Sequence, residues 1–428
     1  MYWEQTIQHA TQTDLGLRRK NNEDSSIVHI CTDYDEWVRR GHLFVVADGM
    51  GGHAVGELAS RLAIETVPHA FLKSQSGDAR TALKSAVELA NEIINQRGTQ
   101  NLDFLHMGTT CSTLTLTPRG ALIAHVGDSR VYRVRRDRID QLTFDHSLEW
   151  EIEHLHGADA GGIDLSQHRN VITRSLGPEE SVRVDVEGPY PILPGDTFVL
   201  CSDGLSNPVS DPEIAAVVRE LSPRQSAQLL VNLANIRGGP DNSTVIVVRV
   251  GDLPKNVAPP PPVEIPSADD ESELGWGWLG AFWGVSMAIV LGLSIVMFGH
   301  PMEGGVVTGA GAIGLIVMLI AVVRRKRPET QRTASDDDSQ TMLCRPHRTG
   351  TAKDSRAFLD DLLAMRAELE RSAHEDGWNV DWKQHDTDRD AALEAKSSKR
   401  YGRGIRDCAR AIDALMSKLP RGNSNGTK

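Results

Sequence analysis

Two apolar segments that each end in the pair Asp-Gly place the strongest constraint on the fold of this chain. The segments LFVVAD (residues 43–48) and FVLCSD (residues 198–203) have the composition of buried β-strands, and glycine follows each final aspartate. A strand that ends in a carboxylate brings an anionic ligand to the rim of a sheet, and the glycine lets the backbone carbonyl approach the same ligand. Together with Glu23, Asp24 and Asp241, the pattern predicts a hydrolase that uses two cations.

The length, charge and cysteine content exclude several classes of protein. At 428 residues the chain is too long for one ordinary core, so more than one structural unit is expected. A net charge of -12 argues against a general nucleic-acid-binding protein, which needs a basic face. Five scattered cysteines without a CxxC pair indicate a reducing compartment, without disulfides or structural zinc. The first residues contain no basic-then-apolar signal segment, which predicts that the first domain stays in the cytosol.

Residues 1–251 alternate strand-like and helix-like patterns. Within residues 113–117 threonine alternates with leucine, and Pro118-Arg119-Gly120 then turns the chain into another apolar segment, which predicts a hairpin. The other strand candidates are residues 42–47, 121–126, 130–134, 197–201 and 244–250, and the helix candidates are residues 56–71, 78–96, 211–219 and 223–236. Because the strands run as meanders and the helices form separate blocks, the pattern favours an α+β fold over a doubly wound parallel sheet.

The composition changes after residue 251. Residues 252–273 contain a proline run and an acidic cluster, which predict an extended linker. Two uncharged apolar stretches follow at residues 274–299 and 304–323, and each reaches the roughly 20 residues needed to cross a bilayer. Both are predicted to be transmembrane helices, with three tryptophans anchoring the start of the first at the membrane interface. The alternative is a buried helical hairpin in a soluble domain.

Four basic residues, 324–327, follow directly after the second apolar stretch. Positive charge stays on the cytoplasmic side of a membrane, so this end is predicted to lie inside the cell. A two-pass hairpin returns the N-terminal domain to the same side. The predicted location is therefore the cell (inner) membrane, with both the N-terminal domain and the tail in the cytoplasm.

The tail, residues 324–428, is predicted to combine disordered and helical segments. A polar stretch at residues 333–339 favours disorder. Two amphipathic helices are expected after it. Their apolar stripes consist of Phe358, Leu362, Met365 and Leu369 in one and of Ile405, Cys408, Ile412, Leu415 and Leu419 in the other. Such stripes serve either as packing surfaces of a small bundle or in partner binding or self-association, and the sequence does not separate these roles.

Eight short motifs carry the charged and glycine-rich positions of the first 250 residues. In order they are RKNNEDS (19–25), VVADGMGGHAVGELAS (45–60), MGTTCSTL (107–114), HVGDSRVYRVR (125–135), LTFDHSLE (142–149), NVITRSLG (170–177), LPGDTFVLCSDGLSNPVSDPEI (193–214) and GGPDNSTVIVV (238–248). This ordered set resembles the metal-dependent protein phosphatases of type 2C (PPM family) in their bacterial form. A single DGxGG motif is a weak signal, because Asp-Gly is also a common turn pair, but eight motifs in order are specific. The resemblance covers nothing beyond the first 250 residues.

The resemblance implies a four-layer α-β-β-α sandwich that binds two Mn²⁺ or Mg²⁺ ions in a cleft at one edge. The implied metal ligands are Asp48 as the bridge between the ions, Glu23 and the Gly49 carbonyl for one ion, and Asp203 and Asp241 for the other. Oxygen donors of this kind suit hard divalent cations. Water between two such ions loses a proton near neutral pH and can attack phosphorus directly, so no nucleophilic cysteine or serine is required.

Two further residues have roles implied by the resemblance. Asp24 would hold a metal-bound water from behind the metal ligands. Arg19, four residues before Glu23, would bind the substrate phosphate, because a planar guanidinium can bind two phosphate oxygens at once. For Arg19 the alternative is a solvated residue in a basic run.

Three positions bear on details of the family pattern. Some relatives carry histidine, a candidate proton donor to the leaving alcohol, where this chain has Met50, so another group must supply that proton. The family often places an acid that helps to hold a third, weaker ion where this chain has Asn207. Asp128 matches the other ligand of that third site, and its alternative role is that of a turn residue between two strands.

The sequence therefore predicts a membrane-anchored serine/threonine protein phosphatase that reverses protein-kinase signalling. Its predicted partners are phosphoproteins, including a receptor kinase in the same membrane. One alternative is a catalytically inactive member that binds phosphoproteins as a scaffold, although the complete set of acidic residues argues against it. Another alternative keeps the chemistry but serves a dedicated phosphoprotein switch.

Overall fold

The computed structural model describes residues 6–52, 54–100, 104, 107–156, 171–252, 276–298, 302, 305–312, 314 and 345–420. The chain forms two compact units, one made of Met1–Pro260 together with Leu343–Lys428 and the other of Pro261–Met342. Most of the tail, residues 343–428, therefore belongs to the same unit as the N-terminal domain, although the sequence placed it in a domain of its own.

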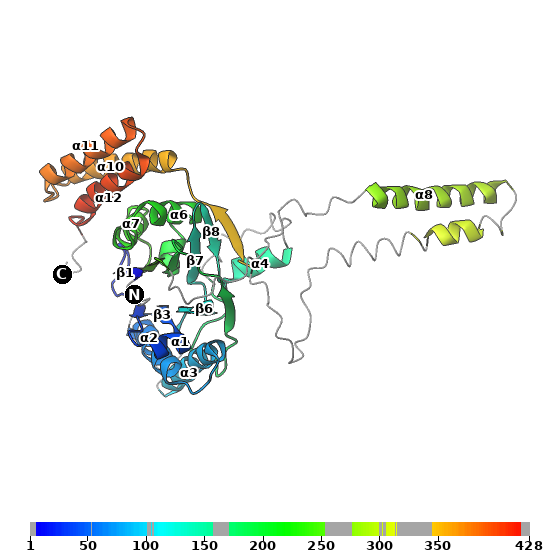
Figure 1. Ribbon diagram of the computed structural model, residues 1–428, viewed down its shortest axis with the longest axis horizontal. Helices are drawn as coiled ribbons and strands as arrows, with labels where there is room; N and C mark the ends of the chain where they lie inside the picture. The colour runs from blue at the N-terminus through cyan, green and yellow to red at the C-terminus, as the bar shows by residue number, and fades with distance from the viewer. Residues whose placement is uncertain are drawn as a thin grey trace, which may run out of the picture. The chain divides into compact units, whose positions relative to one another are not determined.

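The larger unit contains two antiparallel sheets (Figure 1). The first sheet has the order β1-β11-β10-β7-β8-β12, with bounds Ile7–Asp14, Ser243–Val250, Thr197–Cys201, Arg130–Arg135, Arg138–Gln141 and Arg348–Thr351. The second has the order β2-β3-β5-β6-β9, with bounds Asp24–His29, His42–Met50, Cys111–Thr117, Gly120–Val126 and Asp185–Tyr190, and the short β4 (Gly108–Thr109) pairs with β3. The predicted hairpin is confirmed as β5 and β6.

The continuous apolar runs in the sequence arise because the central strands are covered on both faces. In β3, Leu43 and Val45 pack toward helices α2 (Ala54–Lys73) and α3 (Ala79–Thr99), whereas Phe44 faces the other sheet. In β11 the same alternation directs Val247 toward helices α6 (Asp211–Glu220) and α7 (Pro223–Ile236). Successive strand residues point to opposite faces, so a strand between two apolar layers needs apolar residues throughout.

These layers form the predicted α-β-β-α sandwich, with α2 and α3 on one side and α6 and α7 on the other (Figure 1). The four helix candidates of residues 1–251 are confirmed. The short helices are α1 (Tyr34–Arg40), α4 (Leu148–His156) and α5 (Asp203–Ser206). The sequence analysis missed β1, β2, β8 and β9, which lie at or next to sheet edges and carry polar residues.

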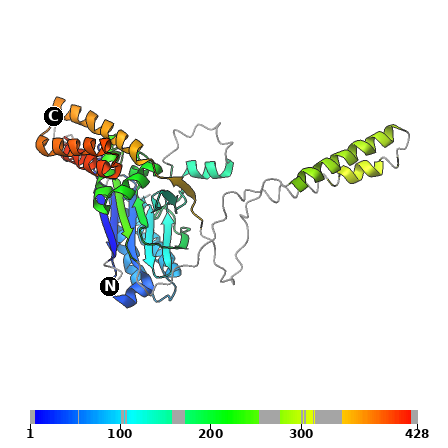
Figure 2. The same cartoon turned by 45° about the horizontal axis from the view of Figure 1, so that its top comes forward.

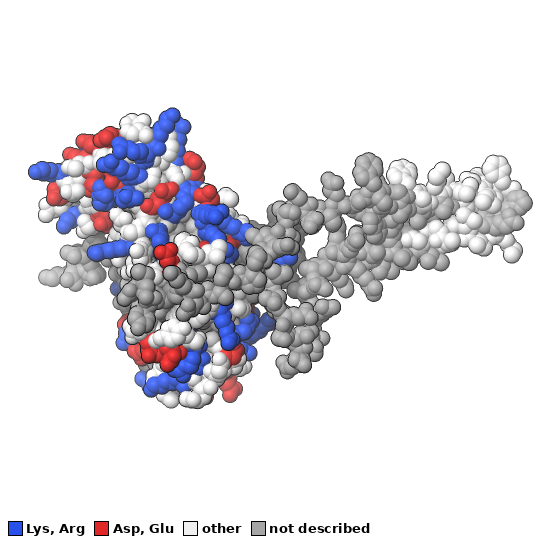
Figure 3. Space-filling model, in the orientation of Figure 1, with Lys and Arg blue, Asp and Glu red and all other residues white. Residues whose placement is uncertain are grey.

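The tail contributes strand β12 and three helices, α10 (Ser355–Glu375), α11 (Trp382–Ser397) and α12 (Tyr401–Met416). The two predicted amphipathic helices are present as α10 and α12, and β12 and α11 were not predicted. Phe358, Leu362 and Ile412 are buried in the same apolar cluster as residues of α6 and α7. The stripes are therefore packing surfaces. Basic and acidic side chains are interspersed on the visible face of these helices (Figure 3).

Replacing Phe358 with alanine tests whether the tail is part of the phosphatase fold. Phe358 is fully buried, so the change is expected to lower the free energy of unfolding by about 3–5 kcal/mol. Denaturant unfolding of the full chain measures this, with Leu393→Ala, at an exposed position on α11, as the matched control. A separate early transition of the tail, with the main transition unchanged, would contradict the shared core.

The smaller unit contains α8 (Trp276–Met297), where the first transmembrane helix was predicted. Among the residues that the structure describes, none of the helices is both long and apolar enough to cross a membrane. The predicted pair of transmembrane helices is therefore not supported there. Of the second predicted span, only residues 305–312 and 314 are described. The polar stretch 333–339 and all but Asp252 of the predicted linker lie outside the described residues.

Candidate metal centre

The predicted acidic residues meet at one end of the two sheets. Asp24 opens β2 and faces Asp48 of β3 directly across the strand pair. Asp203 lies just beyond the end of β10, and Asp241 just before the start of β11, its antiparallel neighbour. Antiparallel pairing brings the end of one strand beside the start of the next. The two sheets thus place residues that are far apart in the chain at a common edge.

Asp24 is a buried member of the cluster. Its Oδ2 accepts a hydrogen bond of 2.8 Å from the Ser202 hydroxyl, while its buried Oδ1 has no hydrogen-bond partner. Burial, with smaller contributions from the charges of Asp203 and Asp241, raises the pKa of Asp24 to about 7 despite the hydrogen bonds that this carboxylate accepts. A carboxylate with a free buried oxygen fits the predicted role of holding water behind the metal ligands.

Burial raises the pKa values of Asp48, Asp128 and Asp203, and neighbouring carboxylates add to this effect, with Asp241 as the neighbour that acts on Asp203. Loss of contact with water is the largest cause at each, while Asp24, Asp203 and Asp128 act on Asp48, and Asp203 acts on Asp128. The Asp203 carboxyl also hydrogen-bonds that of Asp48. Like charges this close cannot all ionise without a counter-charge. Asp128 is buried, and its Oδ1 has no hydrogen-bond partner.

Glu23 and Gly49 are held together by the backbone. The Gly49 N–H donates to the Glu23 carbonyl at 3.2 Å. A Cβ added at Gly56 in α2 would lie 2.1 Å from the Glu23 carboxylate, so only glycine leaves room for that side chain. Gly56 was not singled out from the sequence, although it lies in the same motif as Asp48.

Asn242 organises the site and was missed by the sequence analysis. Its Oδ1 accepts from the Glu23 N–H at 2.8 Å, and its own N–H donates to Asp241 Oδ1 at 2.8 Å. A Cβ at Gly204 would lie 1.9 Å from the Asn242 carbonyl, so the glycine after Asp203 allows close approach to the Asp241 segment. The signal in the sequence was the polar pair Asp241-Asn242 ahead of an apolar strand.

The donor set fits hard divalent cations. It consists of carboxylates and a backbone carbonyl, and beside it the buried Oδ1 atoms of Asp24 and Asp128 have no hydrogen-bond partner. Mn²⁺ and Mg²⁺ prefer such oxygen ligands. Asn207, where the family often has an acid, donates its amide to Asp203 Oδ2 at 3.1 Å, so the third-ion position offers Asp128 but no second carboxylate at Asn207.

Arg19 lies at the rim of the cluster. Its guanidinium is 2.6 Å from Asp241 Oδ2, and 48% of the side chain is exposed. Burial lowers the Arg19 pKa, but the charges of Asp241 and Glu23 outweigh this and leave it above its ordinary value. The position is that of a cation between solvent and the acidic cluster, as the predicted phosphate contact requires.

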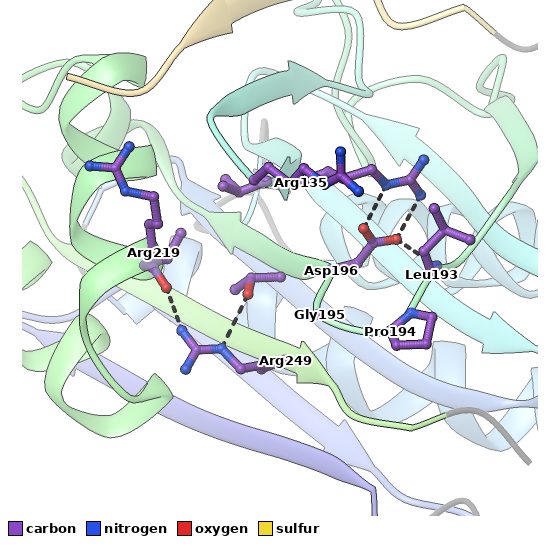
Figure 4. Close-up of a pocket in the computed structure, with 11 residues that line it drawn as sticks. Arg135, Leu193, Pro194, Gly195, Asp196, Arg219 and Arg249 are labelled. Carbon is purple, nitrogen blue, oxygen red and sulfur yellow. Dashed lines mark hydrogen bonds and ion pairs between the residues drawn. The ribbon is translucent and has the colours of Figure 1, made fainter. Parts of the chain in front are cut away.

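A separate cavity of about 530 Å³ lies at the opposite ends of β7, β10 and β11 (Figure 4). Its guanidinium groups already bind protein groups: Arg135 pairs with Asp196 at 2.7 Å, and Arg249 donates to the Leu221 carbonyl at 2.7 Å. It contains no group of carboxylates. The acidic cluster, not this cavity, carries the predicted chemistry.

Two other groups of possible metal ligands occur among the described residues, namely His29 with Cys31 and Glu36, and Glu370 with His385 and Asp386. In the second group Arg389 already binds both carboxylates, at 3.1 and 2.8 Å. In the first, burial raises the pKa of the Cys31 thiol to about 12, and this thiol donates to the Gly41 carbonyl. Neither group matches the acidic cluster as a site for a hard cation.

Comparisons with known proteins agree with this geometry. The family model described as protein phosphatase 2C matches residues 22–234. A putative 2C-type protein phosphatase of Streptococcus pyogenes is 35% identical over 248 residues, which cover 56% of this chain and 95% of that protein. The solved structure of the Streptococcus agalactiae serine/threonine phosphatase is 33% identical, with a TM-score of 0.51, and covers 57% of this chain and 99% of that chain.

A further solved structure, the catalytic domain of the serine/threonine phosphatase PstP in complex with two manganese ions, is 34% identical with a TM-score of 0.48 and covers 57% of this chain and 99% of that chain. The residues that the family model matches contain the strands from β2 to β10, and the motif order predicted the same family. The chain belongs to the protein phosphatase 2C family and is a serine/threonine protein phosphatase.

Proposed function

We propose that this chain hydrolyses phosphoserine and phosphothreonine in proteins with two Mn²⁺ or Mg²⁺ ions held by Glu23, Asp48, Asp203, Asp241 and the Gly49 carbonyl. The observation that carries the proposal is the convergence of these carboxylates at one sheet edge. Burial and neighbouring carboxylates raise the pKa values of Asp48 and Asp203, so their ionised forms favour a nearby positive charge. Two divalent cations would supply that charge.

Each residue of the proposed site would have a separate role in the reaction. When bound, the cations would acidify a water molecule so that it attacks phosphorus without a covalent intermediate on the protein. Asp24, oriented by Ser202, would accept a hydrogen bond from water at the back of the site. Arg19 would orient the phosphate by charge-assisted hydrogen bonds. Met50, which ends β3, offers no proton, so the leaving alcohol must receive one from water or another group.

The full chain should be assayed with phosphoserine, phosphothreonine and phosphotyrosine peptides, with Mn²⁺ or Mg²⁺ and with chelator. The first two peptides are expected to be hydrolysed only when the cation is present. Turnover that survives chelation would exclude the two-cation mechanism. Absence of turnover under all conditions would favour the inactive scaffold.

Replacing Arg19 with alanine is expected to lower kcat/KM for phosphopeptides by about 10- to 100-fold, because charge-assisted hydrogen bonds to the phosphate are lost. The Mn²⁺ concentration for half-maximal activity should change less than about 2-fold, since Arg19 is not a metal ligand. Steady-state kinetics at varied Mn²⁺ measure both values. Arg18→Ala, at the exposed neighbouring arginine, is the matched control, and equal effects of the two variants would remove the assignment.

We also propose that the phosphatase acts at the cytoplasmic face of the membrane and opposes protein kinases, including a receptor kinase in the same membrane. The support is the uncharged sequence of residues 274–299 and 304–323, followed by four basic residues. On α8, Met287 and Leu291 are exposed apolar side chains. Protease added to intact cells should spare both the sandwich and the tail. Recovery of the whole chain in the soluble fraction would contradict membrane attachment.

A further inference from the structure

The tail extends the first sheet of the phosphatase. Strand β12 pairs antiparallel with β8, with Arg348 opposite Gln141 and Thr351 opposite Arg138. The His347 N–H donates to the Gln141 carbonyl at 2.9 Å, and the Thr349 hydroxyl donates to Asp140 at 2.9 Å. The tail therefore covers what would otherwise be an open sheet edge.

The helices that follow β12 pack on α6 and α7 (Figures 1 and 2). Ile405 and Ile412 of α12 are fully buried there, as is Phe358 of α10. At the rim, the Ser355 hydroxyl donates to Glu220 at 2.8 Å. The C-terminal module, defined here as β12 with α10, α11 and α12, is thus attached through both a sheet edge and an apolar interface.

The first residue of β12 contacts the catalytic side of the sandwich. The Arg348 guanidinium lies 4.6 Å from the ring centroid of Trp150, in the first turn of α4. Arg130, which pairs with Asp145 at 2.7 Å, lies 5.9 Å from the same ring. Trp150 is buried and so is held between a tail residue and a residue of β7. The negative face of an aromatic ring attracts a cation that lies over it.

The segment that leads into α4 is hydrogen-bonded to the backbone next to Asp128, a member of the acidic cluster. The His146 N–H donates to the Gly127 carbonyl at 2.8 Å, and the Gly127 N–H donates to His146 Nδ1 at 2.9 Å. Gly127 directly precedes Asp128. Only three residues separate His146 from Trp150. A short series of contacts therefore leads from the tail to the residue before Asp128.

We propose that Arg348 is a positioning residue of the phosphatase: by holding Trp150 it fixes the start of α4 beside the cluster and so favours binding of phosphoprotein substrates. The inference rests on the proposed function. A protein substrate must contact the surface around the cluster, and the segment that leads into α4 is hydrogen-bonded to Gly127 beside Asp128. A small aryl phosphate needs only the cluster and Arg19. Loss of the contact made by the C-terminal module should therefore change the KM for peptides more than it changes kcat.

The test uses the full chain with Arg348→Ala, Arg348→Lys and Arg356→Ala. Arg348 is exposed, so its removal should not unfold the protein. Arg348→Ala is expected to raise KM for a phosphothreonine peptide about 5-fold, with kcat and p-nitrophenyl phosphate kinetics within about 2-fold. Arg348→Lys, which keeps a cation near the ring, should restore most of the loss. Arg356→Ala, an exposed arginine of the same module, should match the wild type.

Hydrogen exchange of the amides of residues 148–152 provides a readout that does not depend on activity. Arg348→Ala should accelerate their exchange, whereas Arg356→Ala should not. If Arg348→Ala kept both the wild-type KM for the peptide and the wild-type rate of amide hydrogen exchange, the proposal would be overturned. An equal loss of activity toward the peptide and p-nitrophenyl phosphate would also overturn it. If the wild type showed no metal-dependent turnover, the proposed function would fail, while the exchange comparison would still decide whether Arg348 holds α4.

Discussion

Replacing Asp48 with asparagine is expected to lower kcat/KM by at least about 10³-fold, or roughly 4 kcal/mol of transition-state stabilisation. The side chain keeps its shape but loses the charge that would bridge two cations. The same change should make the metal-free protein more stable at pH 8, because it removes the charge of a carboxylate whose pKa is raised first by burial and then by repulsion from neighbouring carboxylates. Steady-state kinetics and thermal melting in chelator measure the two effects.

Asp35→Asn, at an exposed position in α1, is the matched control for Asp48→Asn and should alter neither property. A loss of activity together with a loss of metal-free stability would indicate that Asp48 is structural. In that case the carboxylate would stabilise the fold by itself, and its role as a cation ligand would be unsupported.

Removing the divalent cations is expected to abolish turnover and to make stability depend on pH in a defined direction. Asp24 has a folded-state pKa of about 7, above the ordinary value of 3.8. The folded, metal-free protein therefore holds an extra proton between about pH 4 and pH 7, and its stability falls as pH rises through that window. Above pH 7 the stability that this extra proton on Asp24 contributes is fully lost.

Mn²⁺ should reverse that loss, because cations replace the protons as counter-charge. At about 100 times its dissociation constant, a ligand of the folded state adds about 2.7 kcal/mol, which corresponds to a rise in Tm of about 4 °C for a unit of this size. The rise should be larger at pH 8 than at pH 5, where protons compete with the cation. Asp48→Asn should remove most of it. A metal-induced rise that is equal at both pH values would contradict proton–metal competition in the cluster.

The site could be predicted from the sequence where one residue's local context carries the information. Asp48 and Asp203 stand out because each ends an apolar strand and precedes glycine. Asn242 and Ser202 could not be found this way, since their partners Glu23 and Asp24 lie 219 and 178 positions away. Polar residues of this kind become organising groups only when distant strands align.

The structure of the tail could likewise be predicted only in part from its local sequence. Its apolar spacing predicted α10 and α12, because an amphipathic helix buries one face whatever it packs against. The spacing did not reveal that α6 and α7 supply the surface. Strand β12, with the sequence RTGT, has no apolar alternation, because it is held at an edge by backbone hydrogen bonds and polar side chains.

By itself the sequence determined an α+β pattern and the candidate carboxylates at strand ends, because strand periodicity and strand-end residues are local properties of the chain. The four-layer sandwich and the metal-ligand set were implied by the resemblance of the ordered motifs to type 2C phosphatases. Tertiary structure alone decided that the tail joins the catalytic unit and that Arg348 reaches Trp150. Edge pairing and contacts across about 200 residues depend on which surfaces remain uncovered once the two sheets have packed, and no local pattern encodes that.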